Sequence, residues 1–183
     1  MSPTPPSTAL PPAALPQGDP RLLTTPVARE LLAGTALARM AYVAPDGSPR
    51  VVPSWFHWTG EELVTVTYVA GPGVQHPARR LDALRADPRV AVTIDDEGPP
   101  PRVLTLRGRA SVHEVVGVAA EYAAAARRYL GAAAADEMLA ELEHPTLRQA
   151  RICLRPAWVG LLDFTSRLPS AQGGVTVDAA QVG

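Results

Sequence analysis

Short β-prone runs joined by hairpin-length turns dominate the chain between Ala36 and Asp95. Asp46-Gly47 supplies the first turn, and Gly60 marks the second. Strands that are joined by so few residues have to run antiparallel. An antiparallel sheet whose corners carry glycine and proline tends to close on itself, because closure removes its unpaired edges. The pattern therefore predicts an antiparallel β-barrel.

The spacing of apolar residues and the turn residues between them predict the individual elements. Thr25-Pro26 provides an N-cap and a first-turn proline, and Gly34 can end the helix that they begin. Gly108 is a candidate bulge, and Pro156 is expected to kink the last strand. The expected strands are residues 36–43, 50–58, 63–69, 90–95, 103–112, and 150–154 continued by 158–164. The expected helices are residues 25–34, 77–86, 115–130 and 134–142.

Composition divides the chain into a central domain and two tails. Residues 1–20 are rich in proline, serine, threonine and alanine, which predicts a disordered tail. The domain is expected over residues 21–166, with an alanine-rich helical insertion at residues 115–143. Residues 167–183 resemble a C-terminal tail, whose first residues could pack on a neighbouring segment. An apolar fraction of 46% is ample for the core of one such domain.

The totals also limit the partners and the compartment. A net charge of −1 favours neither nucleic acid nor an anionic membrane surface, and no apolar run is long enough to span a bilayer. The single cysteine, Cys153, lies in an apolar run, which suits a small buried side chain in a reducing compartment. The N-terminal segment lacks the basic start of a secretory signal. We therefore expect a cytoplasmic protein.

Two adjacent arginines, Arg79 and Arg80, stand near the start of the helix that is predicted at residues 77–86. Guanidinium groups bind phosphate through paired hydrogen bonds, and a helix N-terminus adds unpaired N–H groups, so together they can form a phosphate site. The alternative is a solvated helix face on which Asp82 is the local ion-pair partner. The spacing of these residues leaves both interpretations open.

The strand that begins at Arg50 can line a groove for a flat ring, whose edge its backbone groups would contact. Thr65 and Thr67 on the next strand would add hydroxyl groups to the same groove. Ordinary sheet packing explains each of these residues equally well. Strand alternation would send Ser54, Phe56 and Trp58 to one face and Val51, Pro53, Trp55 and His57 to the other.

Neither a metal centre nor a set of acid–base residues is indicated. The histidines form no HxH or HExxH pattern, and the chain contains no GxSxG motif. His57 and His76 flank the proposed groove and could reach a phosphate or a substrate oxygen, but an exposed loop position explains His76 as well. We therefore assign no catalytic side chain.

The order of these features, with residues 90–95 and 107–110, resembles the pyridoxamine 5′-phosphate oxidase-like family of flavin-binding split β-barrels. The resemblance covers residues 24–164. It implies a mainly β fold with flanking helices, a split β-barrel of antiparallel strands in the α+β class. It places the family's FMN-contacting strand on residues 50–55, its hydroxyl-bearing strand on Val66 and Thr67, and its Arg-Lys phosphate pair on Arg79 and Arg80. The expected cofactor-binding residues are Arg50, Val51, Val52, Pro53, Ser54, Trp55, Thr65, Val66, Thr67, Arg79 and Arg80.

Two departures from the family pattern argue against oxidation of vitamin B6. The glutamine that touches the flavin in vitamin B6 oxidases aligns with Val103, and their Arg-Leu-His signature is absent near the C-terminus, where residues 161–164 are Leu-Leu-Asp-Phe. The resemblance implies a flavin-dependent oxidoreductase that transfers hydride between bound FMN and a small conjugated substrate. Residues 129–131 are similar to actinobacterial members, some of which use coenzyme F420 in place of FMN. An F420-dependent reductase is therefore the alternative.

The family binds its cofactor between two subunits. A strand that carries Trp55, Phe56 and Trp58 is also more apolar than a monomer would leave exposed. We therefore expect a homodimer with the cofactor at its subunit interface. An alternative of another class is a non-catalytic carrier of flavin or haem, in which His57 or His76 would be the axial ligand of a haem. Nucleic-acid binding through the arginines lacks an aromatic and basic platform.

Overall fold

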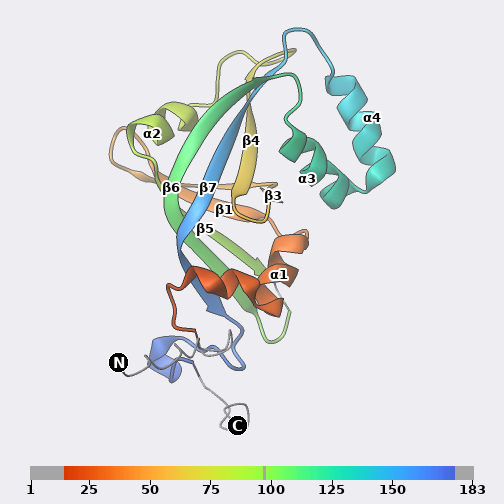
Figure 1. The fold of residues 1–183 in the computed structure, drawn as a ribbon. Coiled ribbons are helices and arrows are strands. Elements are labelled where there is room, and N and C mark those ends of the chain that lie inside the picture. The colour runs from red at the N-terminus through yellow and green to blue at the C-terminus, as the bar shows by residue number, and fades with distance from the viewer. Residues whose placement is uncertain (1–14, 97, 176–183) are drawn as a thin grey trace, which may run out of the picture.

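The computed structural model describes residues 15–96 and 98–175, which form a strongly curved sheet flanked by helices (Figure 1). Within the described part of the chain, seven strands form one antiparallel sheet in the order β2-β1-β5-β6-β7-β4-β3. The predicted fold class is therefore confirmed. The strands are β1 (Ala38–Val43), β2 (Pro49–Ser54), β3 (His57–Trp58), β4 (Leu63–Ala70), β5 (Arg89–Asp96), β6 (Arg102–Val116) and β7 (Arg148–Leu162). The helices are α1 (Pro26–Ala33), α2 (Arg80–Ala86), α3 (Ala120–Leu130) and α4 (Ala132–Leu142), with short 3-10 helices η2 (Pro20–Thr24) and η3 (Ser170–Gln172).

The step from β2 to β3 closes the sheet into a barrel. β2 and β3 form the two edges of the sheet, yet only Trp55 and Phe56 separate them along the chain. Six inter-strand spacings of about 4.8 Å would put the edges of a flat sheet about 29 Å apart. Three Cα steps reach at most about 11 Å, so the sheet has to curl until its edges approach each other.

The single strand that the sequence predicts at residues 50–58 is therefore wrong. Its first part pairs with β1, whereas His57 and Trp58 pair with β4 on the opposite edge. Alternation of side chains cannot reveal such a break, because both pieces are extended and only their long-range partners differ.

The two longest strands, β6 and β7, form the spine of the barrel. Their register shifts between Arg107 and Gly108, which confirms the predicted bulge. A Cβ atom on Gly108 would lie 2.8 Å from the carbonyl oxygen of Arg155, so the two backbones approach closely only because this residue is glycine. Gly108 pairs with Pro156, and β7 continues past this proline as one strand.

The helical insertion begins later than the sequence predicts. Val115 and Val116 extend β6 by pairing with the first residues of β7, and α3 starts only at Ala120. The predicted start of the helix at residue 115, which is also the predicted start of the insertion, is therefore wrong, because Val115 and Val116 belong to β6. Their β-branched side chains favour the strand, and β7 offers partners for their backbone groups.

Helix α1 and the core follow the sequence closely. The hydroxyl of Thr25 accepts a hydrogen bond from the N–H of Ala28 at 3.3 Å, and Gly34 is the C-cap, as predicted. Cys153 is buried as predicted, and this burial raises the pKa of its thiol. The largest fully buried side chains include Phe56, Leu22, Met40, Leu63, Leu81, Leu84, Ile94, Leu104, Leu106 and Ile152.

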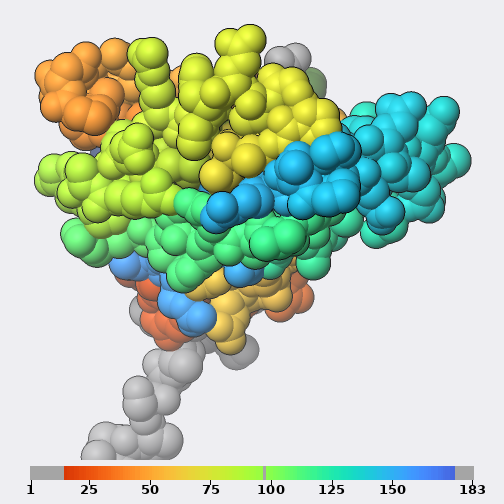
Figure 2. Space-filling view, turned by 90° about the horizontal axis from the view of Figure 1, so that it is seen from above, coloured from red at the N-terminus to blue at the C-terminus, as the bar shows by residue number. Residues whose placement is uncertain are grey.

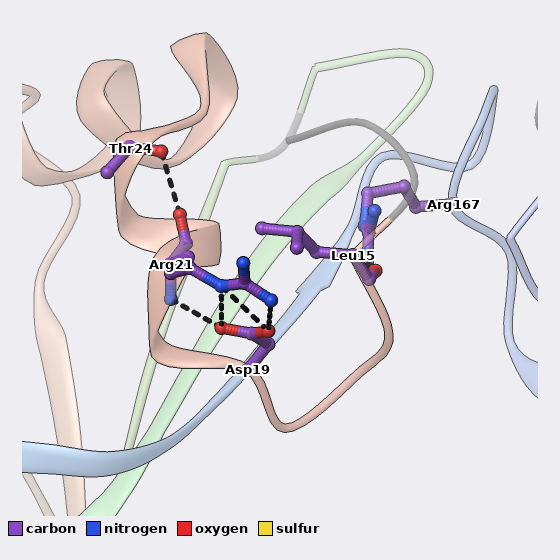
Figure 3. Close-up of polar contacts among 5 residues, drawn as sticks. All are labelled: Leu15, Asp19, Arg21, Thr24 and Arg167. Atoms are coloured by element: carbon purple, nitrogen blue, oxygen red, sulfur yellow. Dashed lines mark hydrogen bonds and ion pairs between the residues drawn. The ribbon is translucent and has the colours of Figure 1, made fainter. Parts of the chain in front are cut away.

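The structure corrects the predicted boundary of the N-terminal tail, because residues 15–20 pack against the domain, and Arg167, the first residue of the predicted C-terminal tail, packs on a neighbouring segment as expected. Leu15 is only 1% exposed, and the Gln17 side chain exchanges two hydrogen bonds with the backbone of Leu161, at 2.5 and 2.8 Å. The guanidinium of Arg167 donates to the carbonyl of Leu15 at 2.6 Å, next to the Asp19–Arg21 ion pair (Figure 3). The remainder of the two predicted tails, residues 1–14 and 176–183, lies outside the described residues.

Candidate functional site

Helix α2 brings the arginine pair next to the hairpin between β1 and β2. The helix begins at Arg80, and Arg79 occupies the position before it. A pocket of about 410 Å³ lies between α2 and the hairpin, and Arg50 and Arg79 both line it, together with Tyr42 and Asp46. In Figure 2 the hairpin tip (orange) and α2 (yellow-green) lie on the same side of the molecule. We call this hollow the α2–hairpin pocket.

The charges around the α2–hairpin pocket are not balanced. Neither Arg79 nor Arg80 forms an ion pair with a carboxylate of the described residues, because Asp82 pairs with Arg85 instead, at 3.2 Å. The alternative, in which Asp82 is the ion-pair partner of Arg79 and Arg80, is therefore wrong. Arg80 is half-buried, and this burial lowers the pKa of its guanidinium, with Tyr42 opposing the shift. A desolvated guanidinium without an acidic partner favours an anionic ligand.

Arg50 differs from the other two arginines because it already has an acidic partner. Its guanidinium lies 3.3 Å from Asp46 in the hairpin turn, and both side chains are well exposed. Hydrogen bonds from the hydroxyl and the N–H of Ser48 hold the pKa of the Asp46 carboxyl below its usual value. An exposed ion pair of this kind is weak, so Arg50 can exchange Asp46 for another anion at little cost.

Strand β2 is an edge strand whose outer face is open. Within the described residues it pairs with β1 alone, so one side of its backbone is free to meet a ligand. Val51 is 66% exposed, and Pro53 is exposed as well. Val52 and Ser54 face the other way and are half-buried. The open edge of β2 lies along the β2 part of residues 50–55, and the cofactor groove that was predicted there stays a prediction.

The two threonines of β4 do not line an open groove within one chain. Thr65 and Thr67 are 2% and 9% exposed, and they pair with Ile152 and Ala150 of β7. Val66, between them, is half-exposed. The sequence suggested hydroxyl groups that are open to a ligand, but both side chains lie on the face of β4 that also carries the fully buried Leu63. Burial of this kind depends on which strands pair, which the local sequence does not encode.

A cluster of aromatic side chains, which the sequence does not reveal as a cluster, packs around Trp55 and Phe56, the two residues that connect the edge strands β2 and β3. Trp55 stacks on Tyr129 of α3 with ring centroids 5.2 Å apart, and Phe56 is fully buried against the same ring. Tyr122 lies beside Trp55, and its hydroxyl is 3.1 Å from that of Tyr68. A spacing of seven residues, about two turns, places Tyr122 and Tyr129 on the same face of α3. The insertion therefore covers Trp55 and Phe56, which corrects the expectation that these rings lie bare for a second subunit.

A second pocket lies on another part of the barrel, among α1, α3 and β3. Its volume is about 400 Å³, and Arg29, His57, Trp58 and Arg128 contribute to its wall. We call it the α1–α3 pocket. Burial lowers the pKa of His57, the charge of Arg128 lowers it further, and Glu121 opposes the shift. His57 is therefore neutral at pH 7 and can donate or accept a hydrogen bond.

Other features of the sequence do not add to either pocket. His76 is exposed, and its Nδ1 lies 2.9 Å from the carbonyl oxygen of Pro77. Val103 pairs with Leu162 in the sheet. Among residues 15–96 and 98–175, no three side chains of the His, Cys, Asp or Glu type gather as a metal site. In the same ranges, no helix is long and apolar enough to cross a membrane.

Comparisons with known proteins agree with this architecture. A sequence profile of the family described as pyridoxamine 5′-phosphate oxidase matches residues 24–163. A search of curated proteins finds no match. A solved structure named F420 reductase is 27% identical, covers 72% of this chain and 94% of its own, and superimposes with a TM-score of 0.57.

Two mycobacterial structures also match. A conserved hypothetical protein from Mycobacterium tuberculosis is 15% identical, with a TM-score of 0.57 and coverage of 83% of this chain and 90% of its own. A haem-binding protein from Mycobacterium smegmatis is 22% identical, with a TM-score of 0.49 and coverage of 78% and 55%. The profile match spans well over half of the chain, and the antiparallel barrel with its flanking helices is the fold that the sequence resemblance implied. This chain therefore belongs to the pyridoxamine 5′-phosphate oxidase-like family of split β-barrels.

Proposed function

We propose that this protein is an oxidoreductase that binds a phosphate-bearing flavin cofactor, FMN in the first place, and transfers hydride between it and a small conjugated substrate. One observation carries the proposal: Arg79 and Arg80 meet no carboxylate of the described residues, although Arg80 is half-buried. Burying a charge without a partner is costly. A cofactor phosphate is the anion that would balance these two guanidinium groups.

The α2–hairpin pocket and strand β2 fit the two ends of such a cofactor. Arg79, Arg80 and Arg50 would hold the phosphate, with Arg50 leaving its exposed contact with Asp46. The open edge of β2 would present backbone N–H and C=O groups to the edge of the ring. Trp55, which Tyr129 holds in place, would border the ring where β2 ends.

The chemistry requires little of the side chains. A bound flavin supplies hydride transfer itself. The residues of this chain would bind and orient the cofactor and limit the access of water, so we assign no side chain as an acid or a base. Val103 and the 161–164 segment lack the groups expected for vitamin B6, so we propose a substrate other than pyridoxamine phosphate.

Coenzyme F420 is the second candidate cofactor, and one observation favours it. The F420 reductase that matches this chain is 27% identical and has a TM-score of 0.57. A cofactor with a longer anionic tail would also use more than one arginine; Arg50 and Arg79 line the same pocket, and Arg80 follows Arg79 at the start of α2. The protein would then be an F420-dependent reductase with the same binding residues.

We further propose a homodimer, with the cofactor at the interface between subunits. The outer face of β1, β2 and β5 is open and mainly apolar, since Val51 is 66% exposed and Val43 is 37% exposed, and it also carries Arg89 and the Arg39–Asp95 ion pair. A shallow hollow of about 370 Å³ on this face is lined by Ala41, Val43, Pro49 and Ala91. An open apolar face of this kind is typical of a protein interface.

Calorimetric titration of the cofactor-free protein with FMN, F420 and riboflavin tests the proposal. Riboflavin is the matched control because it has the ring of FMN but no phosphate. We expect FMN or F420 to bind at least about tenfold more tightly than riboflavin, or about 1.4 kcal/mol. Equal affinity for FMN and riboflavin, or no binding of any of the three, would refute the phosphate assignment. Tight binding without turnover of any conjugated electron acceptor would favour a non-catalytic carrier.

A further inference from the structure

The α1–α3 pocket has an electrostatic character that the proposed cofactor site does not explain. It is separate from that site, because α2 lies on one side of the barrel, and α1 and α3 lie on the other (Figure 1). Its volume of about 400 Å³ falls within the range of small-molecule sites. The two pockets share no lining residue.

Arg128 is a fixed cation at the wall of this pocket. Its guanidinium donates to the carbonyl of Leu32 in α1 at 3.1 Å and to the carbonyl of Phe56 in the barrel crossing. It also lies over the rings of Phe56 and Tyr129, at 4.3 and 4.9 Å from their centroids. These partners are all neutral. The positive charge of Arg128 is therefore held in place without being cancelled.

Acidic side chains near the pocket are already engaged elsewhere. Glu121, two turns before Arg128 in α3, pairs with Arg151, whose Nε donates to it at 2.9 Å. Glu30, next to Arg29 in α1, pairs with Arg102. Arg29 itself meets no carboxylate of the described residues within ion-pair distance. Two arginines thus contribute uncancelled positive charge to one hollow.

The remaining wall is mostly apolar. Leu32 and Ala33 of α1, Ala124 of α3 and the indole of Trp58 complete it. The half-buried imidazole of His57 adds a neutral group that can donate or accept one hydrogen bond. A flat apolar body would fit against the indole and the small side chains, with an anionic group turned toward the arginines.

We propose that the α1–α3 pocket binds a small aromatic carboxylate, with its carboxylate group at Arg29 and Arg128 and its ring against Trp58. A carboxylate supplies the negative charge that Arg29 and Arg128 lack, while the contacts of Arg128 with the carbonyls of Leu32 and Phe56 hold its guanidinium in place. A neutral analogue would leave the charge uncompensated and would lose this contact. Binding here does not depend on a cofactor in the α2–hairpin pocket.

The test compares 1-naphthoate with its neutral isostere 1-naphthamide, by calorimetric titration of the full chain. We expect the acid to bind at least about tenfold more tightly than the amide, the effect of one charge-assisted hydrogen bond. Arg29→Met should weaken binding of the acid by about tenfold and leave the amide unchanged. Arg79→Met, in the other pocket, should alter neither ligand's affinity.

The site is located by the indole N–H resonances of the three tryptophans in a ¹H–¹⁵N spectrum. Naphthoate should shift the resonance of Trp58, assigned with Trp58→Phe, more than those of Trp55 and Trp158. Equal affinity for acid and amide, no effect of Arg29→Met, or a larger shift at Trp158 would each overturn the proposal. FMN affinity that is unchanged by Arg29→Met would leave the cofactor assignment intact, so the two proposals can fail separately.

Discussion

The indole ring of Trp55 stacks on the phenol ring of Tyr129, with centroids 5.2 Å apart and ring planes 9° from parallel. Trp55 belongs to the two-residue crossing between the barrel edges, and Tyr129 belongs to the insertion helix α3. The contact therefore ties the insertion to the point at which the barrel closes. The insertion is part of the structure that shapes β2, and with it the proposed cofactor groove.

A double-mutant cycle on this pair should show direct coupling. Trp55→Leu and Tyr129→Leu should each lower the free energy of unfolding, and together they should lower it by less than the sum of the two effects. Stacked aromatic pairs contribute about 0.5–1.5 kcal/mol beyond the area they bury. Urea denaturation of the four proteins measures this coupling. Trp55→Leu combined with Trp158→Leu is the control and should be additive within about 0.5 kcal/mol; additivity for Trp55 and Tyr129 would contradict the contact.

The titration of His57 should make the free energy of unfolding depend on pH, in a direction that follows from its pKa shift. Burial, then the charge of Arg128, lowers its pKa in the folded state, with Glu121 opposing. Below a pH of about 6.5, the pKa of an unfolded histidine, the unfolded chain binds a proton at His57 that the folded chain does not. The free energy of unfolding therefore decreases as the pH falls through this value. His57→Gln should reduce the slope of the unfolding free energy against pH between about pH 7 and 5.5. An imidazole resonance of His57 that titrates above about 6.5 would contradict this sign.

The glycine at the bulge of β6 offers a clean steric test. A Cβ atom at Gly108 would lie 2.8 Å from a backbone oxygen, whereas one at Gly98 would have no neighbour within 4 Å. Gly108→Ala should lower the free energy of unfolding by about 1–3 kcal/mol, because two backbones would have to separate. Gly98→Ala is the matched control and should change it by less than about 0.5 kcal/mol. If Gly108→Ala and Gly98→Ala lowered the free energy of unfolding equally in thermal or urea denaturation, the close approach of the β6 and β7 backbones at Gly108 would be contradicted.

The proposed homodimer predicts a specific interface. Light scattering at micromolar concentration should give twice the mass of one chain. Val51→Asp should convert the protein to a monomer, because Val51 is 66% exposed on the open face, on its edge strand β2. Val116→Asp is the control at the far end of β6, where Val116 is 82% exposed, and it should remain a dimer. A monomeric wild-type protein would contradict the interface.

Local sequence signals predicted what depends on local structure. The cap at Thr25 and the bulge at Gly108 both follow from backbone preference, and the structure has each of them. The helical pattern at residues 77–86 placed the arginine pair near the start of a helix, and α2 begins at Arg80. These features need no knowledge of which strands pair.

The misses share one cause, which is long-range pairing. The break between Ser54 and His57 exists because the two pieces join opposite edges of the sheet. Thr65 and Thr67 are enclosed because β4 pairs with β7. Arg128 becomes part of a pocket only when α3 folds against Phe56 and α1. A single sequence contains no direct signal for these contacts.

The most direct test of the central claim measures the contact between Arg80 and the cofactor phosphate. FMN and riboflavin are titrated into the wild type, Arg80→Ala, and Arg109→Ala as a control at an exposed arginine of β6. We expect Arg80→Ala to weaken FMN binding by about 1.5–3 kcal/mol and to leave riboflavin binding unchanged, since only FMN carries the phosphate. Arg109→Ala should affect neither. FMN affinity that is unchanged in Arg80→Ala, or equal losses for FMN and riboflavin, would contradict the phosphate site.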